Sequence, residues 1–120
     1  MKVIIAGSRG ITDYHEVIWA MQGAYFHSID PTEIVCGEAR GVDKLGKRYG
    51  NDRHLPVTSF YPEWDKFGLS AGNIRNIQMG NYADALVAIW DGSSRGTKQM
   101  IDYMNHLKKP VYVRNTSIET

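Results

Sequence analysis

The sequence predicts a three-layer α/β fold, in which a parallel sheet of about five strands lies between helices on both faces. Three observations predict it: short apolar runs rich in β-branched residues, segments with helical spacing between them, and glycine-rich loops after several runs. The runs hardly alternate between apolar and polar residues, which is typical of parallel strands buried on both faces. The length of 120 residues indicates a single domain over residues 1–120.

Five short apolar runs are predicted as strands, and the third gives the weakest pattern. They span residues 3–6, 33–36, 56–61, 85–90 and 110–113. Segments with helical spacing lie between them, so strands and helices alternate along the chain. This alternation favours a parallel sheet with right-handed crossovers.

Four helices are predicted between the strands. The middle two are expected over 42–49 and 71–82, and the first and last have apolar stripes. The stripes consist of Val17, Met21 and Ala24 in the first helix and of Met100, Ile101, Met104 and Leu107 in the last. Thr12 or Asp13 is the expected N-cap of the first helix. We expect Asn115 to Thr120 to form a frayed tail.

The composition argues against several classes of protein. The formal net charge of +1 lacks the basic surplus of a protein that coats nucleic acid. The single cysteine, Cys36, cannot form an internal disulfide and is predicted to be a small buried hydrophobe, which fits a reducing compartment. The apolar run at 1–7 is too short for a signal peptide or a membrane span, so we expect a cytoplasmic protein. The four histidines lack metal-ligand spacing, and we expect neither a metal nor a cofactor.

Glycine-rich loops follow three of the predicted strands, where open parallel sheets bind ligands. The candidate ligand-binding residues are Gly7, Ser8 and Arg9 after the first strand, Gly37, Glu38 and Arg40 after the second, and Asp91, Gly92, Ser93, Ser94, Arg95, Gly96 and Thr97 after the fourth. Each loop holds two glycines and an arginine and leads into a helix, whose N-terminal amides attract anions. Clustered arginines repel one another unless an anion lies among them, so the pattern predicts a phosphate-binding site. The loops match neither the Walker phosphate loop nor the dinucleotide fingerprint.

Two further segments are candidates for the same site. Asn73, Arg75 and Asn76 lie near the start of the helix over 71–82, at the end expected to face the ligand. The alternative is a solvated first turn. In the preceding segment, 61–68, Trp64 and Phe67 fit either a stacking lid over a base or core anchors for a long connection.

Four motifs carry a family resemblance. They are Ala-Gly-Ser-Arg at 6–9, Cys-Gly-Glu-Ala-Arg-Gly-Val-Asp at 36–43, Ala-Gly-Asn-Ile-Arg-Asn at 71–76 and Trp-Asp-Gly-Ser-Ser-Arg-Gly-Thr at 90–97. Together they resemble the YspA-related family of the SLOG superfamily of Rossmann-like domains, which is frequent in bacteria and their phages. The resemblance runs from Lys2 to about Val113. It implies a nucleotide-derived ligand: a nucleoside phosphate, ADP-ribose or an NAD-like molecule, bound by a sensor or sequestering domain.

The resemblance also implies two alternatives. Phosphoribohydrolases of the superfamily cleave an N-glycosidic bond with a glutamate in Gly-Thr-x-x-Glu, but here Met100 stands at that position. A glycosidase would therefore need a relocated carboxylate, for which Glu38, Asp91 and Asp102 are candidates. The motif at 37–43 is also similar to a loop of the DNA-processing protein A family, which binds single-stranded DNA. We therefore favour a ligand-binding domain, with the N-glycosidase and the nucleic-acid module as alternatives.

The first and last helices carry more large apolar side chains than one sheet face readily buries. These side chains are Trp19, Tyr25, Met100, Tyr103 and Met104. We therefore expect a homo-oligomer, at least a dimer.

Overall fold

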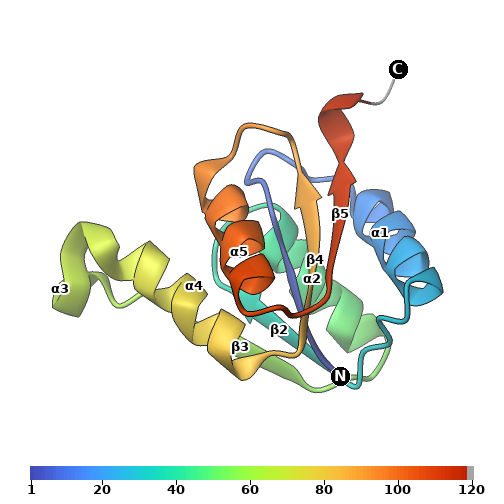
Figure 1. The fold of residues 1–120 in the computed structure, drawn as a ribbon, viewed down its shortest axis with the longest axis horizontal. Helices are drawn as coiled ribbons and strands as arrows, with labels where there is room; N and C mark the ends of the chain where they lie inside the picture. The colour runs from blue at the N-terminus through green and yellow to red at the C-terminus, as the bar shows by residue number, and fades with distance from the viewer. Residues whose placement is uncertain (119–120) are drawn as a thin grey trace.

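The computed structural model describes residues 1–118 and contains, over these residues, a five-stranded sheet. The strands are β1 (Lys2–Gly7), β2 (Glu33–Gly37), β3 (Val57–Phe60), β4 (Ala85–Trp90) and β5 (Val111–Asn115). All neighbouring pairs are parallel, in the order β3-β2-β1-β4-β5 (Figure 1). This confirms the predicted parallel sheet. The strand order reverses between β1 and β4, which pair from Val3 with Ala85 to Gly7 with Ile89.

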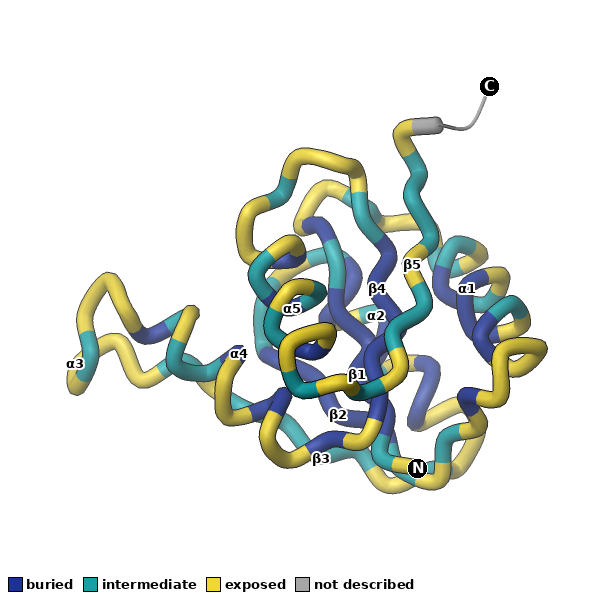
Figure 2. Tube along the Cα trace, in the orientation of Figure 1, coloured by how far each residue is buried: buried dark blue, intermediate teal, exposed yellow. Residues whose placement is uncertain are grey.

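Helices cover both faces of the sheet, which confirms the three-layer arrangement. The long helices are α1 (Tyr14–Phe26), α2 (Val42–Asp52), α4 (Ala71–Tyr82) and α5 (Arg95–His106). Successive side chains of a strand point to opposite faces: Val3 and Ile5 pack with α1 and α2, whereas Ile4 and Ala6 pack with α4 and α5. Figure 1 shows α1 and α5 on opposite sides of the strands, and Figure 2 shows the buried residues along the sheet between them.

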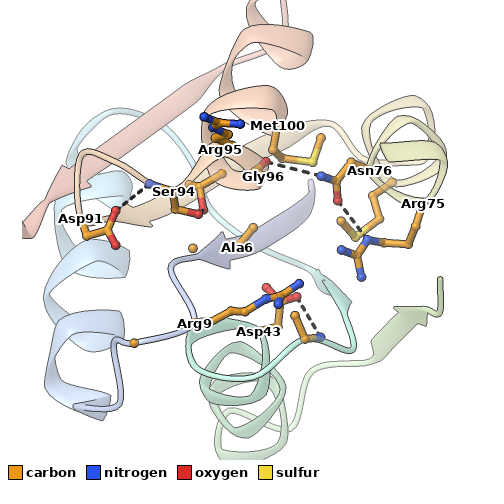
Figure 3. A pocket seen from close by; sticks show the side chains of 15 residues that line it. Ala6, Arg9, Asp43, Arg75, Asn76, Asp91, Ser94, Arg95, Gly96 and Met100 are labelled. Carbon is orange, nitrogen blue, oxygen red and sulfur yellow. Dashed lines mark hydrogen bonds between the residues drawn. The ribbon is translucent and has the colours of Figure 1, made fainter. Parts of the chain in front are cut away.

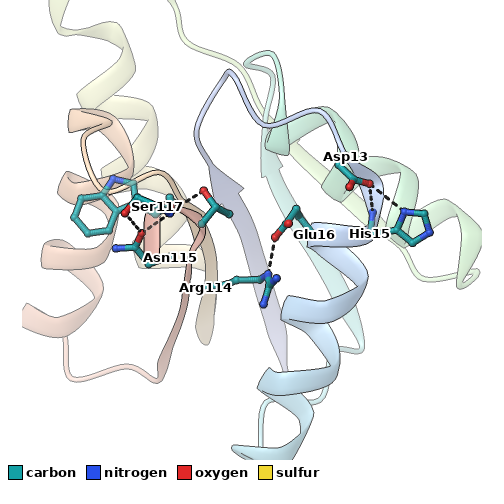
Figure 4. Close-up of polar contacts among 8 residues, drawn as sticks. Asp13, His15, Glu16, Arg114, Asn115 and Ser117 are labelled. Carbon is teal, nitrogen blue, oxygen red and sulfur yellow. Dashed lines mark hydrogen bonds and ion pairs between the residues drawn. The ribbon is translucent and has the colours of Figure 1, made fainter. Parts of the chain in front are cut away.

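Polar contacts cap the start of α1 and join this helix to the last strand. Asp13 is the N-cap of α1, and its Oδ1 accepts the backbone N–H of His15 at 3.0 Å. Nε of Arg114 on β5 donates to Oε2 of Glu16 on α1 at 2.6 Å (Figure 4). Of the two expected N-caps, Asp13 therefore takes the role.

Two segments differ from their prediction. The chain between β3 and α4 contains a short helix, α3 (Trp64–Phe67), and a 3₁₀ turn, η1 (Gly68–Ser70), which extend away from the sheet (Figure 1). The prediction of a frayed tail is wrong for Asn115 to Ile118, because Asn115 ends β5 and η2 (Thr116–Ile118) follows it. Oδ1 of Asn115 holds this turn by accepting the N–H of Ser117 at 3.0 Å. Residues 119–120 lie outside the described residues.

The prediction that the last helix carries more large apolar side chains than the sheet can bury is wrong for Met100 and Met104. Met100 and Met104 are 1% and 0% exposed, because α5 packs both against the face of the sheet that carries Ile4 and Leu86. On α1, Trp19 and Tyr25 are 46% and 62% exposed. Within residues 1–118, no helix is both long and apolar enough to cross a bilayer.

Candidate functional site

A cavity of about 400 Å³ lies at the carboxyl ends of β1 and β4, where the strand order reverses (Figure 3). Parallel sheets bind their ligands at such a point. Nine predicted site residues line it: Gly7, Arg9, Arg75, Asn76, Asp91, Ser94, Arg95, Gly96 and Thr97. A second cavity of about 190 Å³ adjoins it and is lined by Glu38 and Arg40, and also by Arg9 and Arg75. Ser8, Gly37, Asn73, Gly92 and Ser93 line neither of these two cavities.

Ser8 lies beneath the cavity instead of facing it. Its side chain is 1% exposed, its backbone N–H donates to the carbonyl of Ile89 at 3.1 Å, and its Oγ accepts the N–H of Asp91 at 3.0 Å. These bonds join the loop after β1 to the end of β4 and to the loop that follows it. Ser8 therefore holds the two loops in register.

Asp91 organises the loop that leads into α5. Its Oδ1 accepts the backbone N–H groups of Ser93 at 2.9 Å and Ser94 at 2.8 Å. These bonds favour the ionised form and lower the pKa of Asp91 below its ordinary value. The carboxylate therefore has a structural task beside the cavity.

The first turn of α5 opens into the cavity. Arg95, Gly96 and Thr97 were expected in the loop, but they form this turn, and Thr97 is buried with its Oγ1 3.1 Å from Oγ of Ser94. Among the described residues, no side chain caps the turn. No atom of the described chain lies within 4 Å of a Cβ built on Gly96, apart from its neighbours and its own helix. The backbone amides of a helix start left open in this way attract an anion.

Helix α4 contributes Arg75 and Asn76. Nε of Arg75 donates to Oδ1 of Asn76 at 2.9 Å, and Nδ2 of Asn76 donates to Oε1 of Gln99 on α5 at 2.9 Å. Nη1 of Arg75 is buried and has no hydrogen-bond partner within the described part of the chain. Asn76, the third candidate at the start of this helix, is 7% exposed and lines the cavity. The pair thus couples the arginine to the start of α5.

Two glycines let the loops approach one another. A Cβ on Gly37 would lie 2.5 Å from Nη1 of Arg75, so the guanidinium packs directly over the end of β2. Gly41 has φ +71°, and a Cβ there would lie 2.4 Å from the carbonyl oxygen of Arg9. Both positions therefore shape the wall of the cavity without lining it.

Asp43, the second residue of α2, is a cavity residue that the sequence reasoning missed. It is 6% exposed, and its Oδ2 accepts the N–H of Ala39 at 3.2 Å. Burial raises the pKa of Asp43 to about 6, although the charges of Arg75 and Arg9 act in the opposite direction. A polar residue at a helix start is usually solvated, so only the packing could identify it.

The remaining carboxylates lie elsewhere. Glu38 lies in the second cavity, with its Oε1 3.6 Å from Nζ of Lys47. Asp102 lies on the exposed side of α5 and pairs with Nζ of Lys98 at 2.7 Å. Met100, which stands where the Gly-Thr-x-x-Glu motif of the phosphoribohydrolases has its glutamate, lines the main cavity (Figure 3). In residues 1–118, no three His, Cys, Asp or Glu side chains are grouped as a metal site requires.

The comparison with protein families agrees with the motifs. The model of the YspA, cpYpsA-related SLOG family (YAcAr) matches residues 1–67, more than half of the chain. The chain belongs to this family. The SLOG match extends from β1 to the end of α3, so it includes the loops after β1 and β2. Neither the curated proteins nor the solved structures contain a match to the chain.

Proposed function

We propose that this SLOG-family chain binds a nucleotide or nucleotide-derived ligand in the main cavity, as a sensor or sequestering protein. The observation that carries the proposal is the uncapped first turn of α5, which opens into a cavity bordered by Arg9, Arg75 and Arg95. Helix amides and guanidinium groups together recognise phosphate. Family membership supports a nucleotide-related function in general. Nucleoside phosphates, ADP-ribose and NAD-like molecules are the ligands to test.

Calorimetry and thermal unfolding with these compounds test the proposal. A ligand that binds only the folded state raises the melting temperature. Arg95→Ala is expected to weaken binding by tenfold or more without lowering the melting temperature of the free protein, because Arg95 is exposed. Arg48→Ala is the matched control, since Arg48 is an exposed arginine on α2 that lines neither cavity.

Two results would contradict the proposal. The first is that no compound of the panel stabilises the wild type. The second is that Arg95→Ala keeps the affinity of every compound that does. Binding of a single-stranded oligonucleotide with a steep salt dependence would favour the nucleic-acid module instead.

An N-glycosidase is the second candidate, and Asp43 is the observation that favours it. Glycosidic cleavage needs a carboxyl group that transfers a proton or stabilises the sugar cation. A buried carboxyl group with a pKa of about 6 is suited to proton transfer near neutral pH. Chromatography of nucleoside monophosphates incubated with the protein tests this candidate. The N-glycosidase requires that the wild type releases free base and that Asp43→Asn releases none. Glu38→Gln and Asp91→Asn test the other two carboxylates in the same way.

A further inference from the structure

The second cavity adjoins the main one, since Arg9, Ala39 and Arg75 line both. Its volume of about 190 Å³ is below the ~300–1,000 Å³ of pockets that hold a whole ligand. It therefore suits one part of a ligand whose remainder occupies the main cavity.

Trp64 forms one wall of the second cavity. It belongs to α3, is 53% exposed, and its Cη2 lies 3.9 Å from a Cβ built on Gly72 at the start of α4. The core therefore does not account for this side chain, and the core-anchor alternative is wrong for Trp64. A partly exposed indole beside a cavity offers a flat face on which a nucleotide base stacks.

Polar groups of the second cavity complement the edge of a base. Oε1 of Glu38 is buried and accepts no hydrogen bond from residues 1–118, and it forms an ion pair with Nζ of Lys47 at 3.6 Å. Arg40 lines the same cavity, and Nη1 of Arg75 is the second buried polar atom that lacks a partner among these residues. A carboxylate accepts hydrogen bonds from base N–H groups, and arginine donates to the ring nitrogen and carbonyl oxygen of a purine.

We propose that the second cavity is a base subsite, in which a purine base stacks on Trp64 with its N–H edge toward Glu38. The phosphate of the same nucleotide then lies at the first turn of α5, and its sugar passes Arg9 and Arg75. This proposal rests on the proposed function, because it takes the position of the phosphate from it.

Calorimetry with GMP, AMP and ribose 5-phosphate separates the base from the sugar phosphate. Trp64→Ala weakens the binding of GMP and AMP by about fivefold or more, as expected for the loss of a stacked base. The same variant binds ribose 5-phosphate like the wild type, because this probe lacks a base. Trp64→Phe retains most of the affinity. Trp19→Ala is the matched control, since Trp19 is 46% exposed on α1 and lines neither cavity.

Tryptophan fluorescence gives a second measurement. Trp90 lies beside the main cavity, with its Nε1 donating to the carbonyl of Ser94 at 3.0 Å, so it is replaced by phenylalanine in both variants. GMP quenches the emission of the double variant Trp19→Phe, Trp90→Phe, which retains Trp64, but not that of Trp64→Phe, Trp90→Phe, which retains Trp19. Glu38→Gln weakens the binding of GMP and leaves the affinity for ribose 5-phosphate unchanged.

The outcomes separate the two proposals. If Trp64→Ala loses affinity for GMP and ribose 5-phosphate equally, or for neither, the base subsite is overturned and the proposed function remains intact. Full quenching by GMP in the double variant Trp64→Phe, Trp90→Phe likewise overturns the subsite. Failure of the wild type to bind GMP, AMP or ribose 5-phosphate overturns the base subsite, and failure to bind ADP-ribose and NAD-like molecules as well overturns both.

Discussion

The carboxylate of Asp43 accepts the backbone N–H of Ala39 at 3.2 Å, four residues before it, and this bond closes the loop between β2 and α2 against the cavity. The same carboxylate is 6% exposed, and burial raises its pKa to about 6 from an ordinary value of 3.8. The loop geometry and the protonation of the cavity wall are therefore linked through one side chain.

Asp43 makes the stability of the protein depend on pH. Its pKa is higher in the folded than in the unfolded chain, so the folded state binds the proton more tightly, and stability from this group falls as pH rises from about 4 to 6. Asp43→Asn removes the ionisation. It is expected to raise the free energy of unfolding by roughly 2–3 kcal/mol at pH 8, with little gain at pH 4, since one pKa unit is worth about 1.4 kcal/mol. Urea denaturation at the two pH values measures this. Asp102→Asn is the control, and an equal effect of both variants at pH 8 contradicts the prediction.

Gly96 separates ligand binding from stability. A Cβ at this position meets no atom of the described chain within 4 Å beyond its neighbours and its own helix, so Gly96→Ala fits the fold. Alanine favours a helix by roughly 0.5–1 kcal/mol over glycine, so the melting temperature should rise slightly. The added methyl group occupies the space through which a phosphate reaches the amides of α5, so binding should weaken at least tenfold. Unchanged affinity, measured by calorimetry, would place the phosphate elsewhere. Asn105→Ala near the other end of α5 is the control.

Met100 is expected to leave the wild type without glycosidase activity. Met100 lines the main cavity at the position of the phosphoribohydrolase glutamate, and a thioether neither transfers a proton nor stabilises a sugar cation. Purified wild type should therefore release no base from AMP or GMP. Met100→Glu should give detectable release and lower the free energy of unfolding by roughly 1–3 kcal/mol, because the new carboxyl group is buried. Release of base by the wild type, abolished in Asp43→Asn, would instead establish the second candidate function.

The proposal of a homodimer now depends on α1. Tyr25 and Phe26 at its end are 62% and 84% exposed, whereas Met100 and Met104 of α5 are buried. Sedimentation at micromolar concentration is expected to give twice the 13.6 kDa mass of the chain. The double variant Tyr25→Ser, Phe26→Ser should give the single mass, and Leu69→Ser, which changes a fully exposed residue far along the chain, should not. A wild-type species of 13.6 kDa would contradict the prediction.

Strand positions could be predicted because a strand that is buried on both faces is apolar throughout, and helix positions could be predicted from their apolar stripes. The run at 85–90 is apolar throughout, and it coincides with β4. Short α3 has no such mark, since its four residues bury none of their side chains fully. Its boundaries depend instead on local geometry, with Gly68 at φ +56° after it.

The loops of the candidate site could also be located, but the orientation of their side chains could not. Ser8 and Arg9 are neighbours in one glycine-rich loop, yet Ser8 is bonded beneath the cavity and Arg9 lines it. The role of Asp43 depends on Arg75, which lies 32 positions later and reaches it only through the packing of α4 over the sheet. Sequence spacing alone carries no information about such a contact.

The hydrogen bond between Ser8 and Asp91 joins residues 83 positions apart in the sequence. The paired strands that precede these residues, β1 and β4, are almost as far apart in the sequence. Contacts of such high sequence separation form late, because the chain must first close a long loop at an entropic cost. During synthesis, β1 therefore waits with one edge unpaired until β4 has been made. The binding cavity therefore depends on long-range strand pairing, and a ligand that fills it would stabilise the folded state in which this pairing is complete.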